Sequence, residues 1–166
     1  MISQTNQLSL SKTTPVHFVG VGGIGMSGLA KLLLEAGFKV SGSDLKLNQY
    51  TQFLQDNGAT LYQGHSGEQV PDDAVVVVTT AANESNPELV AAREKSLPVF
   101  HRSDLLREIL EGAAFNHEIR IGITGTHGKT STTGMTGHAL AAAGVLPTVI
   151  AGGLIPGWDT NATFGQ

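Results

Sequence analysis

The sequence of 166 residues contains no cysteine, few charged residues and no long apolar run. The absence of cysteine excludes a disulfide framework, a thiolate zinc site, an iron–sulfur cluster and a thiol nucleophile. Charged residues make up 14% of the chain and the net charge is −4, a sign that argues against binding nucleic acid through its phosphates. No apolar stretch approaches the roughly 20 residues that a membrane-spanning helix needs. We therefore expect a cytoplasmic protein without membrane insertion and without a nucleic-acid partner.

Glycine, in contrast, is abundant. The chain contains 21 glycines, nearly twice the usual share of about 7%. They follow no repeat, which excludes a collagen-like chain, and 40% of all residues are hydrophobic, which excludes a disordered one. We expect these glycines where the backbone comes close to another group.

Short apolar runs alternate with segments of helical period along the chain. This alternation predicts an α/β fold, with a Rossmann-like parallel sheet and helices on both of its faces. The first helix is indicated by apolar residues that share one helical face before a terminating glycine. The apolar residues are Met26, Leu29, Ala30 and Leu33, and the glycine is Gly37. Further helices are expected at Asn48–Asn57, Asn86–Lys95 and Ser103–Gly112. Strands are expected at Val16–Gly20, Lys39–Ser43, Thr60–Tyr62, Ala74–Thr80 and Val99–Phe100.

The pattern divides the chain into three parts. The polar residues 1–15 are expected to form a flexible leader, and residues 16–117 the Rossmann-like domain. Residues 118–166 are expected to form the start of a P-loop ATP-binding α/β domain. Their pattern predicts a strand at Arg120–Thr124, a helix from Thr130 to about Ala143 and a strand at Thr148–Ile150, and it shows no clear period over Gly152–Gln166. One strand, helix and strand are too little to form a stable sheet. This second domain is therefore expected to be incomplete, and its exposed edges could self-associate.

The first glycine-rich loop is a G-x-G-x-x-G pattern at Gly20, Gly22 and Gly25, between a predicted strand and a predicted helix. Glycine allows the tight turn and the close approach of backbone to a pyrophosphate, while the helix N-terminus offers unpaired N–H groups to the anion. Asp44 follows 24 residues after Gly20, where an acidic residue commonly binds ribose hydroxyls. The pattern predicts a dinucleotide or a nucleotide-sugar diphosphate and does not distinguish the two.

The second glycine-rich loop, Gly122–Ser131, departs from a Walker A motif because Ile123 stands where its first glycine belongs. It keeps the elements that bind phosphate. These are a glycine-rich turn after a predicted strand, Lys129 for the β- and γ-phosphates, and the Thr130 hydroxyl for Mg²⁺ at the start of a helix. The loop therefore predicts an ATP site.

Taken together, the motifs resemble those of the Mur ligases, which join amino acids to UDP-muramyl precursors of peptidoglycan. The similarity runs from about His17 to the end of the chain, and the motifs are most similar to those of members that add L-alanine. The segments that carry it are His17–Ser27, Ser41–Leu45, Asn86–Glu88, Gly125–Thr130 and Gly152–Leu154.

The resemblance implies a bacterial, ATP-dependent ligase with UDP-N-acetylmuramate, ATP and L-alanine as partners and Mg²⁺ as cofactor. The γ-phosphate would pass to the lactyl carboxylate, and the amine of L-alanine would attack the acyl phosphate. Lys129 would stabilise the transferred phosphoryl group, and Thr130 would bind Mg²⁺. The UDP-substrate site would comprise Gly22, Gly23, Ile24, Gly25, Met26, Ser27, Asp44, Leu45, His65, Thr80, Ala81 and Ala82, and the ATP site Gly125, Thr126, His127, Gly128, Lys129, Thr130 and Ser131.

Family members are close to three times as long as this sequence. The resemblance therefore leads us to expect a fragment that binds the UDP substrate but does not ligate, with the acidic Mg²⁺ ligands and the C-terminal domain outside it. Three alternatives stay open. They are an NAD(P)-binding oxidoreductase domain, a non-catalytic nucleotide-binding module, and a ligase that attaches a recycled peptide to the same UDP-sugar.

The histidines allow different interpretations. His17 lies between apolar neighbours on a predicted strand, which favours a core residue. His65 could line the crevice or lie on a surface loop, and His127 could donate to a phosphate or brace its turn. No histidine spacing indicates a metal site. Tyr50 and Trp158 are expected only to pack.

Overall fold

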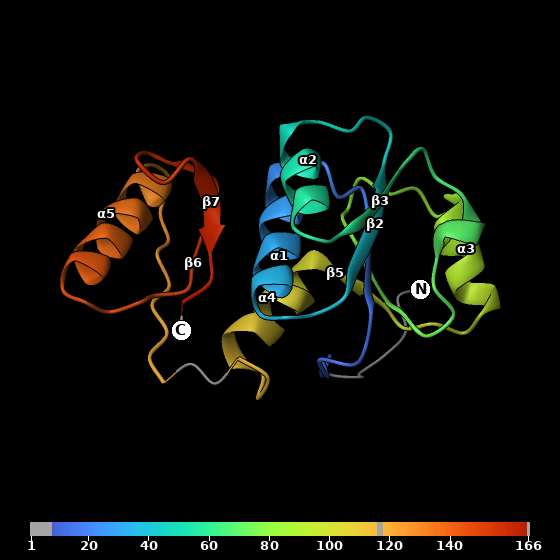
Figure 1. Cartoon of the computed structure of the whole chain (residues 1–166), viewed down its shortest axis with the longest axis horizontal. Helices are drawn as coiled ribbons and strands as arrows, with labels where there is room; N and C mark the ends of the chain where they lie inside the picture. Colours follow the sequence, from blue (N-terminus) through green and yellow to red (C-terminus); the bar gives the residue numbers. More distant parts are fainter. Residues whose placement is uncertain (1–7, 116–117, 166) are drawn as a thin grey trace.

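The computed structural model describes residues 8–115 and 118–165. Its larger part is a parallel five-stranded sheet in the order β3-β2-β1-β4-β5 (Figure 1), which confirms the predicted Rossmann-like α/β fold. The chain moves from β1 outward to β3 and then crosses back to β4, so the strand order reverses beside β1. Ligands of such sheets bind outside the carboxyl ends of the strands at this reversal. The strands are β1 (Val16–Val19), β2 (Val40–Asp44), β3 (Thr60–Gln63), β4 (Val75–Val78) and β5 (Val99–His101).

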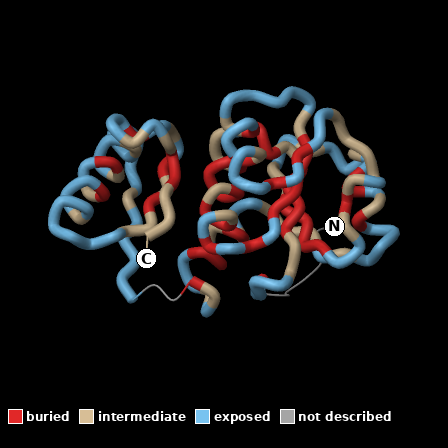
Figure 2. Tube along the Cα trace, viewed as in Figure 1, coloured by how far each residue is buried: buried red, intermediate tan, exposed pale blue. Residues whose placement is uncertain are grey.

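Helices cover both faces of the sheet. Figure 2 shows the buried residues gathered in the sheet and in the helices beside it. Alternate strand side chains divide between two hydrophobic clusters: Phe18 and Val77 pack with α1, α2 and α4, whereas Val19 and Val76 pack with α3. The helices are α1 (Ile24–Glu35), α2 (Gln49–Asp56), α3 (Pro87–Glu94) and α4 (Arg102–Glu111), with a short 3₁₀ turn η1 at Gly67–Gln69.

Local signals define most helix ends as predicted. Gly37 follows α1 with a φ of 85°, and its amide and that of Phe38 bond back to the carbonyl groups of Leu34 and Leu33. This left-handed end suits glycine because it lacks a Cβ. Asn48 and Asn86 cap α2 and α3 through their side-chain oxygens.

The start of α4 differs from the prediction that Ser103 caps it. The helix begins at Arg102, directly after β5, and its N-cap residue is His101. Nδ1 of His101 accepts from the amide of Ser103 at 3.3 Å, while Oδ2 of Asp104 accepts from the amide of His101 at 3.1 Å. Since β5 leads into α4 without a loop, the cap lies on the last residue of the strand.

The described part of the expected leader packs against the domain, so that expectation is wrong for residues 8–15. Leu8 and Leu10 are buried in the main hydrophobic cluster. The amide of Leu10 donates to Oε1 of Glu108 at 3.0 Å, and the carbonyl oxygen of Pro15 accepts from Val75. Residues 1–7 of the leader lie outside the described residues.

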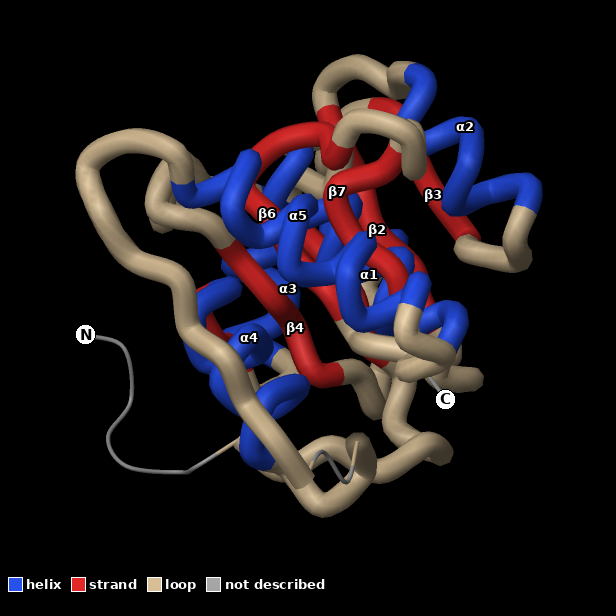
Figure 3. Tube along the Cα trace, turned by 90° about the vertical axis from the view of Figure 1, so that its left-hand side faces the viewer, coloured by secondary structure: helices blue, strands red, loops and turns tan. Residues whose placement is uncertain are grey.

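The second unit consists of α5 (Lys129–Ala142) and an antiparallel hairpin of β6 (Val149–Ile155) and β7 (Thr160–Thr163). Figure 3, which views the molecule from the side of this unit, shows the hairpin beside α5. The predicted strand at Arg120–Thr124 is wrong, because no described strand lies beside it to pair with its backbone. The stretch from Gly152, expected to lack regular structure, instead completes β6 and forms β7.

The hairpin packs on α1 through three side-chain-to-backbone hydrogen bonds. Nδ2 of Asn161 donates to the carbonyl oxygen of Ile24 at 2.8 Å, and Nζ of Lys31 donates to that of Ala162 at 2.5 Å. At the far end of α1, Oε2 of Glu35 accepts from the amide of Phe164 at 2.9 Å. These bonds fix the second unit along the helix that begins at the first glycine loop. Within the described residues, no helix is long and apolar enough to cross a membrane.

Candidate functional site

The first glycine loop lies at the carboxyl edge of the sheet, between β1 and α1. The amides of Gly20 and Val21 both donate to the carbonyl oxygen of Ser43 at 2.9 Å. This anchors the start of the loop to the end of β2. The fold thus brings the loop, Asp44, His65 and the segment after β4 to one edge, as the resemblance predicts for carboxyl ends of parallel strands.

Asp44 braces the middle of this loop. Its Oδ2 accepts from the amide of Gly22 at 2.8 Å, and its Oδ1 accepts from the amide of Lys46 at 3.2 Å. Nδ2 of Asn48 donates to the carbonyl oxygen of Gly22 at 2.9 Å. A Cβ on Gly22 would lie 2.8 Å from Oδ2 of Asp44. The close approach of the Asp44 carboxylate therefore requires glycine at position 22. Each oxygen of Asp44 accepts one hydrogen bond from a backbone amide.

The N-terminus of α1 offers free backbone donors. Gly23 is the N-cap residue and no side chain caps the helix. Within the described residues, the amides of Gly23, Ile24 and Gly25 make no hydrogen bond, whereas those of Met26 and Ser27 bond to the carbonyl oxygen of Gly23. Free amides at the positive end of a twelve-residue helix favour an anion.

Arg102 lies beside these amides and was missed by the sequence analysis. A Cβ on Gly25 would stand 2.6 Å from Nη1 of Arg102. The guanidinium has no ion pair and no hydrogen bond to another described residue. The sequence could have pointed to Arg102 by its position, because it directly follows a strand that ends at the same edge of the sheet as the glycine loop.

Of the remaining predicted substrate residues, Met26 and Ser27 are buried in the first turn of α1, and the others lie around this edge. Leu45 is 70% exposed. Thr80 and Ala81 are exposed in the turn after β4, where the amide of Ala82 donates to the carbonyl oxygen of Thr79 at 3.1 Å. Their predicted contacts with the uridine and the diphosphate stay predictions.

His65 belongs to a polar network that enters the interior of the domain. Its Nδ1 lies 2.8 Å from Oε2 of Glu88 and 2.8 Å from Oγ of Ser43. Ser43 donates to the same Oε2 at 2.6 Å. His65 is 18% exposed and Glu88 fully buried, so His65 is no simple surface residue.

The deeper end of the network is formed by His17. Its Nε2 lies 2.9 Å from Oε1 of Glu88, and its Nδ1 lies 2.8 Å from Oγ of Ser41. His17 is fully buried, which confirms the predicted core histidine. Burial acts to raise the pKa of the Glu88 carboxyl, but hydrogen bonds from His17, Ser43 and His65 outweigh it and lower the pKa. Glu88 is thus a buried carboxylate with satisfied oxygens; its segment Asn86–Glu88 was part of the resemblance, but the sequence analysis gave Glu88 no role.

The second glycine loop leads into α5. Gly128 is its N-cap residue, with a φ of 76°. Nζ of Lys129 donates to the carbonyl oxygens of Gly125 at 2.5 Å and Thr126 at 3.3 Å. The Thr130 hydroxyl makes no hydrogen bond to a described residue, and a Cβ on Gly153 of β6 would lie 3.9 Å from it.

Other predicted members of the second loop are open to solvent. His127 and Ser131 are exposed. No described hydrogen bond or ion pair joins residues 125–131 to the crevice at the first loop. Among the described residues, no group of three or more histidine, aspartate or glutamate side chains could hold a metal ion.

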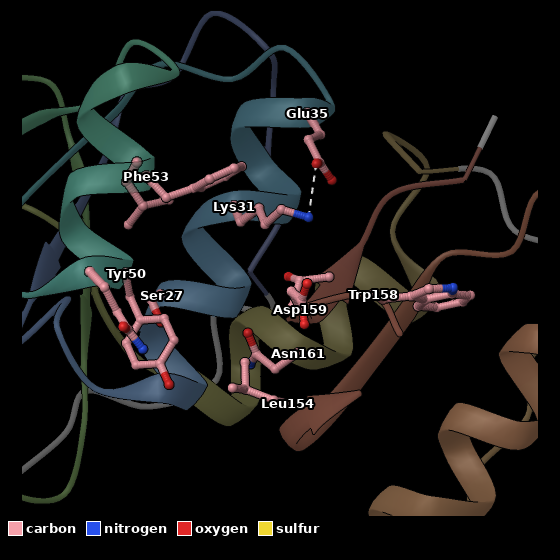
Figure 4. Close-up of a pocket in the computed structure, with 12 residues that line it drawn as sticks. Ser27, Lys31, Glu35, Tyr50, Phe53, Leu154, Trp158, Asp159 and Asn161 are labelled. Atoms are coloured by element: carbon pink, nitrogen blue, oxygen red, sulfur yellow. Dashed lines mark ion pairs between the residues drawn. The ribbon is translucent and has the colours of Figure 1, made fainter. Parts of the chain in front are cut away.

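A cleft of about 590 Å³ runs between α1, α2 and the hairpin. Figure 4 shows Lys31 and Phe53 on one side and Trp158 and Leu154 on the other, with the ion pair of Lys31 and Glu35 drawn. The Lys31–Glu35 pair spans 3.0 Å. The rings of Trp158 and His138 are in contact, with centroids 4.6 Å apart and planes tilted by 51°, and Trp158 also forms part of the cleft wall.

Comparisons of sequence place these features among known proteins. The model of the Mur ligase family, catalytic domain, matches residues 15–113. The UDP-N-acetylmuramate–L-alanine ligase of Synechococcus sp. strain JA-3-3Ab is 50% identical over 150 residues, covering 90% of this chain and 28% of the relative. The ligase of that name from Desulfotalea psychrophila is 46% identical, covering 91% of this chain and 32% of the relative. The chain thus spans about a third of the length of these curated relatives.

Solved structures agree with the sequence comparisons. The UDP-N-acetylmuramate-alanine ligase from Thermotoga maritima matches with a TM-score of 0.82 and 34% identity, covering 91% of this chain and 35% of that one. The UDP-N-acetylmuramate:L-alanyl-gamma-D-glutamyl-meso-diaminopimelate ligase from Neisseria meningitides matches with a TM-score of 0.79 and 30% identity, covering 93% of this chain and 47% of that one.

Proposed function

The chain belongs to the Mur ligase family, and from this premise we propose that it binds UDP-N-acetylmuramate at the carboxyl edge of its sheet and Mg-ATP at the loop before α5. It would serve the ligation of L-alanine in peptidoglycan synthesis.

One observation carries the proposal for the first site. Three unpaired amides at the N-terminus of α1 lie beside the unpaired guanidinium of Arg102. A diphosphate supplies acceptor oxygens and negative charge, which both groups require. The amides and the guanidinium together would hold the diphosphate, with Gly23 to Gly25 as its backbone cradle.

The relatives support the choice of nucleotide and amino acid. The curated ligases named for UDP-N-acetylmuramate and L-alanine are 50% and 46% identical to this chain. Among the solved structures, the alanine ligase from Thermotoga maritima is 34% identical and the ligase from Neisseria meningitides, named for a tripeptide, is 30% identical. We therefore assign alanine addition rather than attachment of a recycled peptide.

The second loop supports a phosphoryl-transfer role. Lys129 lies in the first turn of α5 and bonds only to carbonyl groups of its own loop, which a phosphate would replace. The free Thr130 hydroxyl suits a Mg²⁺ ligand, and the metal would neutralise phosphate charge there. Lys129 would stabilise the γ-phosphate as it passes to the lactyl carboxylate, before the amine of L-alanine attacks the acyl phosphate.

Isothermal titration of the chain with UDP-N-acetylmuramate tests the first site. We expect saturable binding that is lost in Gly25→Val, because a side chain there collides with Arg102. NADH and UDP-glucose serve as comparison ligands. Preferential binding of NADH would instead support the oxidoreductase alternative, and no binding of any of the three would overturn the proposal.

A second assay addresses the expectation that these residues bind substrate without ligating it. Phosphate release is measured with the chain, ATP, L-alanine and UDP-N-acetylmuramate together. No release above the level without L-alanine is expected. Release that depends on both ATP and L-alanine would contradict this part of the proposal.

A further inference from the structure

We propose that Glu88 is a positioning residue: it holds a proton on Nδ1 of His65, so that Nε2 of His65 faces the crevice as a hydrogen-bond acceptor for a sugar hydroxyl of the bound nucleotide. The role of His65 toward the ligand rests on the function proposed above. The position of the proton does not, because it follows from contacts within the protein.

The proton position follows from counting donors around Oε2 of Glu88. Ser43 has a single hydroxyl proton, and it donates this proton to Oε2 at 2.6 Å. Oγ of Ser43 therefore has no proton left for Nδ1 of His65. An ionised carboxylate only accepts hydrogen bonds. With both neighbours acting as acceptors at 2.8 Å, Nδ1 of His65 must be the donor.

The deeper contacts keep Glu88 in place as an acceptor. Nε2 of His17 donates to Oε1 at 2.9 Å, and Nδ1 of His17 lies 2.8 Å from Oγ of Ser41. Both His17 and Glu88 are fully buried. A buried carboxylate is tolerated only when its oxygens are hydrogen bonded, and a tightly packed interior prevents it from rotating away.

The other nitrogen of His65 is left for a ligand. Nε2 makes no hydrogen bond to a described residue and is not a buried orphan atom. His65 follows Gly64, whose amide bonds to the carbonyl oxygen of Asp44 at 2.8 Å. The ring therefore lies at the edge where the glycine loop begins.

A sugar hydroxyl bound at this edge of the sheet can donate its proton to a free acceptor on the protein. A neutral ring with a proton on Nδ1 has a lone pair on Nε2, which accepts a hydrogen bond but cannot donate one to a phosphate. The sequence suggested Asp44 for the ribose hydroxyls, and its oxygens each accept one bond, from the backbone amides of Gly22 and Lys46. His65 supplies a free acceptor for such a hydroxyl.

Nitrogen-15 NMR of the histidine rings at pH 8 tests the proton position without a ligand. The chain has six histidines, and the signals of His65 are identified by their loss in His65→Gln. We expect a neutral ring with its proton on Nδ1. A neutral ring with its proton on Nε2, or a doubly protonated ring, would overturn the proposal, whatever the outcome for variants of Glu88 or Ser43.

Glu88→Gln is the decisive variant. With its side-chain oxygen on His17, the amide nitrogen of glutamine would donate toward Ser43 and His65. Nδ1 of His65 then becomes an acceptor, and its proton moves to Nε2. Ser43→Ala is the matched control, since Glu88 still accepts from Nδ1 and the proton should stay. An unchanged ring in Glu88→Gln, or the same change in Ser43→Ala, would contradict the assignment.

The same nitrogen-15 spectra test the proposed contact between Nε2 of His65 and a sugar hydroxyl of the ligand. Adding UDP-N-acetylmuramate should shift the Nε2 signal of His65 and leave its Nδ1 proton in place. Glu88→Gln should bind about tenfold more weakly, the loss of one hydrogen bond. If the nucleotide binds by calorimetry but leaves the Nε2 signal unchanged, the hydroxyl contact is wrong. Failure of the proposed function would instead appear as absent binding, with the Nδ1 proton still observed.

Discussion

The side-chain amide of Asn161 donates to the carbonyl oxygen of Ile24 at 2.8 Å and lies directly against Gly28. A Cβ on Gly28 would stand 2.4 Å from Nδ2 of Asn161. The Asn161 amide thus reaches the carbonyl oxygen of Ile24 only because position 28 of α1 has no side chain. Glycine inside a helix costs about 1 kcal/mol relative to alanine, so this contact offsets a local penalty.

Gly28→Ala is therefore expected to lower the free energy of unfolding by about 1 kcal/mol or more, because it expels the Asn161 amide from its bond. The measurement is urea unfolding of single and double variants in a double-mutant cycle. In an Asn161→Ala background, the same substitution should become neutral or stabilising, by helix propensity alone. Equal effects of Gly28→Ala in both backgrounds would show that Asn161 is not the cause.

Arg102→Ala is expected to weaken binding of UDP-N-acetylmuramate by about 10- to 100-fold, the loss of a charge-assisted hydrogen bond. Thermal stability should change little, since Arg102 has no ion-pair partner among the described residues. Arg107→Ala, on the same helix with a distant 3.9 Å contact to Asp104, is the control. Calorimetric titration of both variants with UDP-N-acetylmuramate compares their affinities. Equal affinities would remove Arg102 from the diphosphate site.

Glu88 should make stability depend on pH in the acid range. Its pKa in the folded chain lies below the ordinary 4.5, so the unfolded chain takes up the proton first as the pH falls. The contribution of Glu88 is then present in full above pH 4.5 and is lost as the pH falls through the lowered pKa.

Urea unfolding of the wild type and Glu88→Gln between pH 7 and pH 3 measures this contribution. At pH 7 the variant should be less stable by about 1–3 kcal/mol. The difference should narrow below pH 4.5, because only the wild type loses its carboxylate. Parallel curves over the whole range would show that the carboxyl has an ordinary pKa.

Lys129→Ala should abolish detectable binding of Mg-ATP while leaving binding of UDP-N-acetylmuramate unchanged. The ammonium group lies on the second loop only, with its bonds to Gly125 and Thr126. Calorimetric titration with each nucleotide separates the two sites, and the exposed Lys12→Ala is the control for loss of a positive charge. Retention of ATP binding in Lys129→Ala would exclude the lysine from the phosphate site.

The sequence predicted the parallel sheet and the first glycine loop because both depend on local patterns. Runs such as Val75–Val78 indicate a strand buried on both faces, and Gly37 has the left-handed backbone that its position implied. The hairpin was missed, although Pro156 and Gly157 form a turn signal between its strands. Polar residues such as Asn161 obscured the short strand that follows.

The contacts of the candidate site were predictable only in part. Gly22, Asp44 and His65 come to one edge because parallel strands end there. Glu88 belongs to a segment that resembles the family, but its contacts could not be predicted, since its partners lie on β1, on β2 and in the loop after β3, which only the folded sheet brings together. Arg102 was overlooked for the same reason: its neighbour Gly25 is far away along the chain.

The contact between the rings of Trp158 and His138 has an optical consequence. Trp158 is the only tryptophan of the chain, and it lies in the hairpin turn where the second unit borders the cleft beside α1. Its emission therefore comes from a single place, beside a histidine ring whose centroid lies 4.6 Å away. The protein contains its own fluorescent reporter of the junction between its two units, and no label is needed to follow a change there.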